Sequence, residues 1–478
     1  MTKPILKIRR VPALNPKYKI TTFNGDTLTP IAIYNRLNGK KKFLLESSLQ
    51  HDEKGRYSFI GMNPYLEYKA AHDQITIYSK QQTLRERGKP LEVLKKYIPK
   101  LEAEIPFPFY GGGVGYIGYD TIRQYEKIGE IANDTMKMPD IHLMFYQEAI
   151  VFDHVSQTVS IILLNADQKR TDDELTQITE QLKLTIFTAN DIVETSTSPA
   201  KMNFTPIKTK EEFMEMVESA KKHIQQGDIF QVVLSQALEG EVTVDPFQFY
   251  RKLRNANPSP YMFYIDFEDY ILLGASPESL IKTKSGELTT NPIAGTRPRG
   301  KSKLEDRQLE QDLLSDEKEL AEHKMLVDLS RNDVGRVCEA GSITIPKFME
   351  IERYQHVMHI VSEVKGRLKP NLSGIDALVS CLPAGTVSGA PKIRAMQIIN
   401  ELEKRKRGVY AGAVGYINVN GDIDFALAIR SLVIKDKKAI LQTGAGIVYD
   451  SIPEKEYEET MNKAKSLLEV NSYDLVNR

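Results

Sequence analysis

The sequence predicts an α+β fold with antiparallel β-sheet. Apolar residues make up 41% and charged residues 27% of the 478 positions, so the chain can bury a large core. In the second half of the chain, several predicted strands follow one another with no helix between them. This order favours antiparallel sheet over a doubly wound parallel one. The length indicates two or three domains, or one large composite core.

A polar segment divides the chain. Residues 188–208 are rich in Ser and Thr and contain two prolines, which predicts a linker. We therefore expect an N-terminal part at 1–190 and a C-terminal domain at 205–478. The domain opens with a helix, because Thr209 and Glu212 form a capping box and Gly227 ends the apolar stripe. Hydrophobic patterns then predict strands at 229–238, 270–276, 279–284, 356–364, 413–419 and 439–446, and helices at 303–330, 390–405 and 453–470.

Charge and cysteine content exclude several classes of protein. Lys plus Arg and Asp plus Glu both number 64, which argues against a nucleic-acid-binding protein. Cys338 and Cys381 are too few for a disulfide framework or a Cys-rich zinc site. No apolar run approaches the roughly 20 residues that span a bilayer. The basic N-terminus lacks the apolar core of a signal peptide. We expect a soluble cytoplasmic protein with no membrane contact.

Two nucleotide-binding patterns occur, and we expect neither to bind nucleotide. Gly113–Gly118 fits GxGxxG, but prolines interrupt the segment before it, so a glycine-rich strand packed against another backbone is the better interpretation. Residues 295–302 fit GxxxxGK[ST], but Pro298 has no N–H to offer a phosphate and the preceding segment is polar. A phosphate-loop protein remains a remote alternative. Separately, residues 110–117 resemble 410–417, either as two similar strands or as one strand repeated in two related halves.

Carboxylates on two predicted helices suggest a metal site. Glu456, Glu459 and Lys463 share one helix face, which by spacing alone is more often a solvated Glu–Lys pair. Glu319 and Glu322 stand in a similar relation on another helix. Such a pair of helices suits Mg²⁺, which takes one or two protein carboxylates plus oxygens of an anionic substrate. Turns rich in Gly and Thr at 291–300, 383–392 and 443–446 could direct N–H groups at a carboxylate.

Several motifs together carry a family resemblance. GASPESL, NPIAGTRPRG, AEHKMLVDLSRNDVGRV, YQHVMHIVSEV, PAGTVSGAPKIRAM and QTGAG, in this order, resemble the chorismate-utilising enzymes, and within them the anthranilate synthase large subunits. The resemblance is dense over about 205–470 and thinner before it, at LLESS and GGGVGYIGYD. It implies two layers of large, mainly antiparallel β-sheet with flanking helices. It also implies Mg²⁺-dependent conversion of chorismate and ammonia to anthranilate and pyruvate through aminodeoxyisochorismate, the first committed step of tryptophan biosynthesis.

The resemblance also implies residue roles. Glu278 is similar to the general acid that helps the C4 hydroxyl leave, and this role needs a raised pKa. His359 and Thr386 resemble other catalytic-pocket residues, although a lone strand histidine or turn threonine is more often structural. Glu322 and Glu459 resemble the Mg²⁺ ligands, with Glu319 and Glu456 behind them. The substrate contacts implied are Gly295, Thr296, Tyr410, Arg430, Gly444, Ala445, Gly446 and Lys463.

Two positions separate this chain from its relatives within the resemblance. Aminodeoxychorismate synthases have a nucleophilic Lys where this chain has Ala294. Isochorismate and salicylate synthases have a water-activating Lys where this chain has Gln231, which is no base at neutral pH. Both differences favour direct attack by ammonia, as in an anthranilate synthase. Aminodeoxychorismate synthase is the alternative.

The resemblance further implies a partner and an inhibitor. Neither cysteine lies in a GxCxG-type elbow, so the chain lacks its own glutaminase nucleophile. We expect a separate glutamine amidotransferase subunit that supplies ammonia, and hence a hetero-oligomer. Ser47, Pro260, Tyr261 and Met262 resemble a tryptophan inhibitor site, although each segment alone is more often an ordinary turn or strand start.

Overall fold

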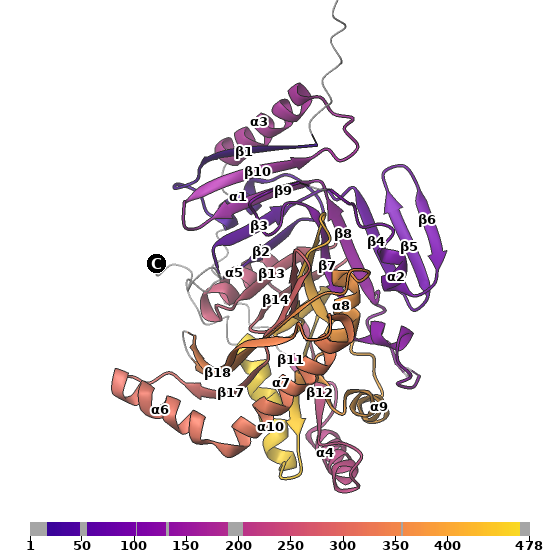
Figure 1. Cartoon of the computed structure of the whole chain (residues 1–478), viewed down its shortest axis with the longest axis vertical. Coiled ribbons are helices and arrows are strands. Elements are labelled where there is room, and N and C mark those ends of the chain that lie inside the picture. The colour runs from indigo at the N-terminus through magenta and orange to yellow at the C-terminus, as the bar shows by residue number, and fades with distance from the viewer. Residues whose placement is uncertain are drawn as a thin grey trace, which may run out of the picture.

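Two large antiparallel sheets form the centre of the molecule (Figure 1). The computed structural model describes residues 17–47, 55–101, 103–130, 133–189, 204–354 and 357–468. In the described chain the first sheet has the strand order β1 (Tyr18–Asn24), β10 (Thr158–Leu164), β9 (Glu148–Asp153), β3 (Tyr57–Gly61), β2 (Phe43–Glu46), β13 (Tyr261–Asp266), β14 (Ile271–Ser276), β23 (Ser431–Lys435), β24 (Lys438–Ile447), β12 (Gln231–Glu241) and β11 (Phe204–Pro206), with β20 (Gly389–Ala390) on β12.

The second sheet contains strands from both ends of the chain as well. Its order is β17 (Ile293–Pro298), β19 (Val357–Arg367), β16 (Glu287–Thr290), β15 (Ser279–Lys284), β22 (Ile423–Leu427), β21 (Ala413–Asn418), β7 (Gly112–Ile117), β8 (Ile141–Tyr146), β4 (Leu66–Ala71), β5 (Gln74–Ser79) and β6 (Thr83–Arg87), with β18 (Thr344–Arg353) on β19.

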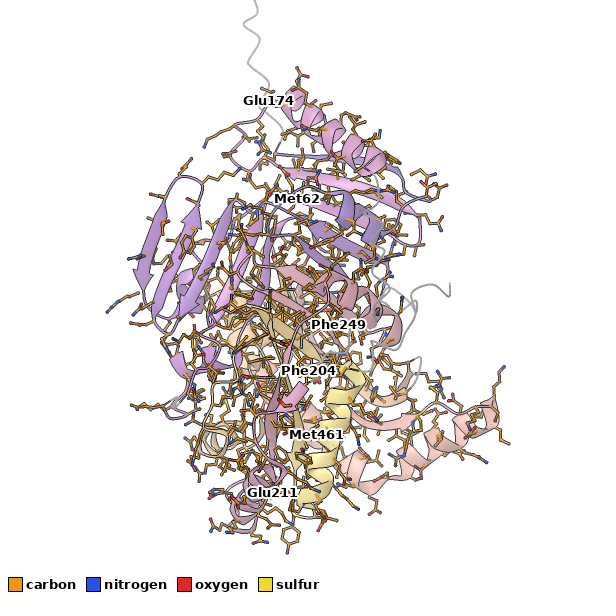
Figure 2. The ribbon with its side chains drawn as sticks, turned by 180° about the vertical axis from the view of Figure 1, so that it is seen from behind. Met62, Glu174, Phe204, Glu211, Phe249 and Met461 are labelled. Atoms are coloured by element: carbon orange, nitrogen blue, oxygen red, sulfur yellow. The ribbon has the colours of Figure 1, made fainter. Side chains whose placement is uncertain are left out.

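Alternation along the strands builds the layers. Phe43 and Leu45 of β2 point into an aromatic-rich core between the sheets, whereas Leu44 packs on the outer face. Helices α1 (Pro30–Arg36), α3 (Asp172–Thr188), α5 (Pro246–Ala256) and α10 (Pro453–Leu468) cover the outer face of the first sheet. Phe249, Phe204 and Met461 mark this covered face from the upper to the lower half (Figure 2). The expected two-layer α+β fold with flanking helices is confirmed.

The other helices cover the second sheet and one end of the first. Helices α2 (Pro90–Leu94), α7 (Glu317–Val337) and α8 (Gly374–Cys381) pack on the second sheet. Helices α4 (Lys210–Gln225) and α9 (Lys392–Glu403) pack on β12 and β24. Helix α6 (Lys303–Ser315) projects from the sheets beside β17 and β18 (Figure 1). Within the described segments, no helix is both long and apolar enough to cross a bilayer.

The repeated glycine-rich segment forms the centre of the second sheet. Strands β7 and β21 pair antiparallel, and Gly115 lies opposite Gly415. A Cβ on Gly115 would lie 2.0 Å from the His142 carbonyl oxygen, and one on Gly415 would lie 2.1 Å from the Asp424 oxygen. Each sheet continues outward from its centre in a matching order, so the repeat reflects two related halves. The close approach also supports the rejection of nucleotide binding at 113–118.

Most predicted elements of the C-terminal domain are present. Helix α4 begins with the predicted capping box of Thr209 and Glu212. The prediction of one helix over 303–330 was wrong, because the chain forms α6 and α7 with a break at Asp316. Asp316 is extended, and its carboxylate accepts hydrogen bonds from the backbone N–H groups of Lys318 and Glu319. It therefore caps a new helix instead of continuing the old one.

The division of the chain at 188–208 stays a prediction. Residues 190–203 of the predicted linker lie outside the described residues. The strands before and after this segment are interleaved at the centres of both sheets, through β2–β13 and β7–β21. The 1–190 and 205–478 parts therefore share one pair of sheets.

Candidate active site

Glu278 lies in the turn between β14 and β15. Its Oε1 accepts a hydrogen bond of 2.9 Å from Thr386 Oγ1, which belongs to the short 3-10 helix η2 (Gly385–Val387). Its carbonyl oxygen accepts from the Leu427 N–H at 3.0 Å, which ties the turn to β22. Burial raises the pKa of Glu278 from 4.5 to about 7, against the lowering effects of the Thr386 hydrogen bond and the Arg430 charge. A carboxyl group of this kind can be protonated at neutral pH.

His359 lies on β19 opposite Thr296 of β17. Its Nδ1 is 2.9 Å from the Gly295 carbonyl oxygen and 3.0 Å from Thr296 Oγ1. Because a carbonyl oxygen can only accept, Nδ1 carries the hydrogen and Nε2 keeps its lone pair. Burial lowers the pKa of His359, which favours the neutral ring. Tyr354, which the sequence did not single out, packs against this ring with centroids 5.4 Å apart.

Arg430 connects these two groups. It follows β22, and its carbonyl oxygen accepts from the Ala275 N–H at 3.1 Å. Its φ of 49° is in the left-handed region, an uncommon conformation for a residue with a side chain. The positive charge of Arg430 acts to lower the pKa of both Glu278 and His359, so Arg430 lies near enough to both side chains to influence their ionisation. Among the described residues, no ion pair within 4.0 Å joins its guanidinium to a carboxylate.

A second group of predicted residues meets on β24. A Cβ on Gly444 would lie 2.8 Å from Tyr410 Oη, and one on Gly446 would lie 2.7 Å from Gln231 Nε2. Lys463 of α10 donates to the Gly444 carbonyl oxygen at 3.0 Å. The glycines therefore let two side chains and a lysine approach the same backbone. Ala445 differs, because its side chain points into the core beneath α4 and α9.

Residues 443–446, which were predicted as a turn, are instead part of strand β24 and pair with β12. The predicted metal ligands border this part of β24 from two helices. Glu322 of α7 accepts from Gln231 Nε2 at 3.0 Å, and Glu459 of α10 pairs with Lys463 at 2.7 Å. Burial and then the charge of Glu322 raise the pKa of Glu319. Burial, and to a smaller extent the charge of Glu459, raise the pKa of Glu456, whereas a hydrogen bond with Ser451 lowers it. In the described part of the chain, no three His, Cys, Asp or Glu side chains are grouped closely enough to hold a metal by themselves.

The predicted inhibitor residues lie at the joint of β2 and β13. Met262 pairs with Glu46, and Ser47 follows directly. Met262 faces the helix-covered side, but the Tyr261 hydroxyl points between the sheets and donates to Asp424 at 3.2 Å. The structure therefore places Tyr261 and Met262 side chains on opposite faces.

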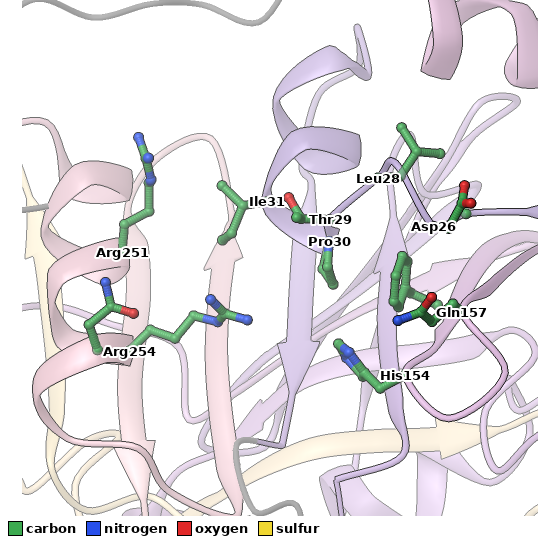
Figure 3. A pocket seen from close by; sticks show the side chains of 12 residues that line it. Asp26, Leu28, Thr29, Pro30, Ile31, His154, Gln157, Arg251 and Arg254 are labelled. Carbon is green, nitrogen blue, oxygen red and sulfur yellow. The ribbon is translucent and has the colours of Figure 1, made fainter. Parts of the chain in front are cut away.

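A cavity of about 430 Å³ opens on the helix-covered side, between the start of α1 and the Arg251 and Arg254 side chains of α5 (Figure 3). Glu46 is buried, accepts from Tyr250 Oη at 2.8 Å and pairs with Arg254 at 3.1 Å. Arg254 in turn lines the cavity, together with His154 and the start of α1 at Pro30. The volume lies within the range of small-molecule sites.

The phosphate-loop alternative finds no support in the geometry. Gly295 to Pro298 form strand β17, paired with β19. The Gly300 N–H donates to Asp306 Oδ1 at 2.9 Å and the Lys301 N–H donates to Glu305 Oε2 at 2.7 Å. These N–H groups are therefore occupied by carboxylates of the following helix, where a phosphate would need them.

Comparison with known proteins agrees with this architecture. Residues 41–469 match the family model described as chorismate binding enzyme. The chain therefore belongs to the chorismate-binding enzyme family.

Within that family, the chain is 46% identical to anthranilate synthase component 1 of Lactococcus lactis, over 95% of this chain and 99% of the relative. It is 43% identical to the Aquifex aeolicus protein of the same name, over 97% of each. The crystal structure of anthranilate synthase component I from Streptococcus pneumoniae superposes with a TM-score of 0.81, at 45% identity over 93% of this chain and 98% of that one. The menaquinone-specific isochorismate synthase from Escherichia coli, 18% identical, shares the fold with a TM-score of 0.71 over 96% of each chain.

Proposed function

We propose that this chain is the large subunit of an anthranilate synthase, which converts chorismate and ammonia to anthranilate and pyruvate. The observation that carries the proposal is the Glu278 carboxyl, protonatable at neutral pH, beside Arg430 and His359. The relatives named anthranilate synthase component 1 support it. Ala294 and Gln231 support it too, because neither can act as the lysine nucleophile or base of the alternative reactions.

In the proposed first step, ammonia adds at C2 as the C4–O bond breaks. The Thr386 hydroxyl donates to Oε1 of Glu278, so the acidic proton resides on Oε2. Glu278 gives this proton to the departing oxygen, which leaves as water. The ammonium formed at C2 loses a proton, so the step is balanced and yields aminodeoxyisochorismate. General acid catalysis of this type contributes roughly 10²–10⁴-fold.

In the proposed second step, the ring becomes aromatic and pyruvate leaves. A base removes the C2 hydrogen, and the electron pair of that bond forms the C2–C3 double bond as the bond from C3 to the enolpyruvyl oxygen breaks. The released enolpyruvate takes up a proton at its methylene carbon and becomes pyruvate. Neutral His359 suits the first task, because its Nδ1–H is fixed on the Gly295 carbonyl and its Nε2 is free to accept. Arg430, Tyr410, Lys463 and the backbone N–H groups at 444–446 of β24 would hold the substrate carboxylates.

We propose that Glu322 and Glu459 hold Mg²⁺. The residues fit this ion, because Glu322 of α7 contacts Gln231 next to Gly446, and Glu459 of α10 contacts Lys463 next to Gly444, so both acidic side chains border the same part of β24. Two carboxylates with the remaining positions open are typical of Mg²⁺ bound together with an anionic substrate. When bound, the ion would neutralise a chorismate carboxylate.

The function is tested directly by fluorescence. With chorismate, MgCl₂ and ammonium chloride at pH about 8, the purified chain should form anthranilate, which fluoresces against a low background because the chain has no Trp. Omitting ammonium or adding EDTA should abolish the signal. If the product is instead aminodeoxychorismate or isochorismate, the proposal is wrong and the alternative activity stands. Glutamine in place of ammonium should give no product.

We also propose that a glutamine amidotransferase subunit supplies the ammonia in the cell, in a hetero-oligomer. Both cysteines are free and buried, and burial raises the pKa of Cys338 to about 11 and that of Cys381 further. Neither is therefore a reactive thiolate at neutral pH. The name component 1, which the relatives bear, agrees with a second component. Free thiols also agree with a reducing, cytoplasmic setting.

We propose that tryptophan inhibits the enzyme by binding beside Ser47, Pro260 and Met262. A buried carboxylate at Glu46 suits the amino group of an amino acid, and Arg254 suits its carboxylate. The neighbouring cavity could accept the indole ring. Because β13 continues into β14 and Glu278, a ligand at this joint could change the position of the acid. Tyr261 would act only through its backbone, since its side chain points away.

Ser47→Arg should relieve this inhibition. The larger side chain would occupy the space at the β2–β13 joint, so about tenfold more tryptophan should be needed for half-inhibition of the ammonia-dependent reaction. Activity without tryptophan should change less than twofold. Ser285→Arg, an exposed turn position on the second sheet, is the matched control and should leave inhibition unchanged. Full wild-type activity in saturating tryptophan would refute the regulation itself.

A further inference from the structure

Arg407 is a buried residue next to the candidate site. It stands three residues before Tyr410, and its side chain is 1% exposed. Its Nε and Nη2 donate to the two carboxylate oxygens of Glu403 at 2.9 and 2.5 Å. Nη2 also donates to the Val233 carbonyl oxygen at 2.8 Å, and Nη1 donates to that of Val387 at 2.7 Å. One guanidinium thus joins the end of α9 to two other segments, at Val387 and Val233.

The contacts of Arg407 lie next to three different groups of the candidate site. Val387 directly follows Thr386 in η2, the residue that donates to Glu278. Val233 lies on β12, opposite Gly446 of β24. The Arg407 guanidinium carbon also lies 5.6 Å from the centre of the Tyr410 ring. The Arg407 guanidinium therefore contacts the Tyr410 ring, the residue after Thr386, and the strand that pairs with residues 444–446 of β24.

Glu403 connects Arg407 to the part of β12 that lies opposite Gly444 of β24. Its Oε1 accepts from the Ser235 N–H at 2.8 Å and from Ser235 Oγ at 2.9 Å. Ser235 lies directly opposite Gly444 in the β12–β24 ladder. Because Gly444 is in close contact with Tyr410 Oη, a small shift of β12 would change the distance between these two groups.

We propose that Arg407, held by Glu403, is a positioning residue that sets the distance between the Glu278–Thr386 pair and the Tyr410–Gly444 wall. This inference rests on the proposed chorismate reaction. The planar fork of arginine matters, because it bonds a carboxylate on one side and two carbonyl oxygens on the other. A lysine keeps the charge but has one nitrogen and cannot reach all these acceptors at once.

Arg407→Lys tests this role in the ammonia-dependent reaction. We expect kcat to fall roughly 100-fold, as misplacement by about 1 Å can cause, and KM for chorismate to rise about fivefold. A weakened Thr386 hydrogen bond would also raise the pKa of Glu278, because that bond lowers it. The fall of kcat/KM with rising pH should therefore move to higher pH. If Arg407 contributed to stability alone, the fall of kcat/KM would occur at the same pH in R407K as in the wild type.

Lys406→Met is the matched control. Lys406 is also buried, but it forms ion pairs with Asp140 at 2.8 Å and Asp134 at 3.2 Å, in the segment before β8. It should lose stability and keep wild-type kcat and KM. If R407K is unfolded by circular dichroism, Glu403→Gln, which keeps the arginine but loses a charged partner, decides the question by the same three readouts.

The outcomes separate the two proposals. Absence of anthranilate from the wild-type chain would refute the proposed function. A productive wild type with a folded R407K of unchanged kcat, KM and pH profile would overturn the positioning role alone. Equal losses in R407K and K406M would overturn it as well, because general destabilisation would then explain both. Loss in R407K with an unaffected K406M supports it.

Discussion

Glu278→Gln should reduce anthranilate formation by roughly 10²–10⁴-fold, the usual contribution of a general acid. The amide keeps the shape of the carboxyl and can accept the Thr386 hydrogen bond, but it has no acidic proton for the departing oxygen. The wild-type kcat/KM for chorismate should fall above pH about 7, as Glu278 ionises. The variant should lack this limb. The measurement is initial rate against pH at constant free ammonia, because total ammonium would add its own titration.

The same substitution should stabilise the protein at alkaline pH. The pKa of Glu278 is raised in the fold, so the folded chain holds its proton between pH 4.5 and about 7 while the unfolded chain releases it. Folding stability therefore falls through this window, and the loss is complete above it. Glu278 is half-buried, so the cost of its ionisation is at most about 3 kcal/mol. A permanently neutral amide avoids this cost, so the unfolding midpoint in urea at pH 8 should rise.

Glu287→Gln is the control for both effects. Glu287 carries the same charge on an exposed strand position, so its loss should change neither the rate nor the pH dependence of stability by much. The difference in stability between E278Q and wild type should be larger at pH 8 than at pH 5. If E278Q is inactive but this difference is the same at both pH values, the raised pKa of Glu278 is contradicted. An active E278Q would contradict the role as acid.

Local chemistry made much of the fold predictable. Thr209 and Glu212 form a capping box from their own side chains and backbone, so the pattern is enough to place the start of α4. The repeated glycine segment left two interpretations open, two similar strands or two related halves, and only the matching strand orders of the two sheets favour the second. The break at Asp316 was missed because two apolar stripes in phase resemble one helix, and the cap between them depends on a single φ and ψ.

The site was predicted from recognised motifs and could not have been predicted from spacing. Spacing placed Glu459 and Lys463 on one face, but it could not show that Lys463 reaches Gly444 on another element. The raised pKa of Glu278 depends on burial by segments far away in sequence. Arg407 gave no signal, since a Lys- and Arg-rich stretch normally lies in solvent and only the fold buries it. Long-range packing, not residue type, determines these properties.

Glu322→Gln and Glu459→Gln should each lower activity at millimolar Mg²⁺ by at least roughly 100-fold, the upper end of what loss of an outer metal partner costs. Each removes one of two proposed carboxylate ligands and leaves a neutral amide. Excess MgCl₂ should restore part of the rate, because the remaining ligands still favour the ion. Calorimetric titration of Mg²⁺ in the presence of chorismate gives a readout independent of turnover. The affinity of each variant for Mg²⁺ should fall together with its activity.

Glu458→Gln is the matched control for this pair. It makes the same change of charge one residue away on α10, on an exposed side chain outside the proposed ligand set. A general electrostatic effect of the helix would weaken Mg²⁺ binding in E458Q as much as in E459Q, and that result would contradict the assignment. A loss of affinity in E459Q alone would still have two explanations, because the substitution also removes the carboxylate that lies 2.7 Å from the Lys463 ammonium. Lys463→Met should then keep Mg²⁺ binding but raise KM for chorismate, which distinguishes metal ligation by Glu459 from its orientation of Lys463.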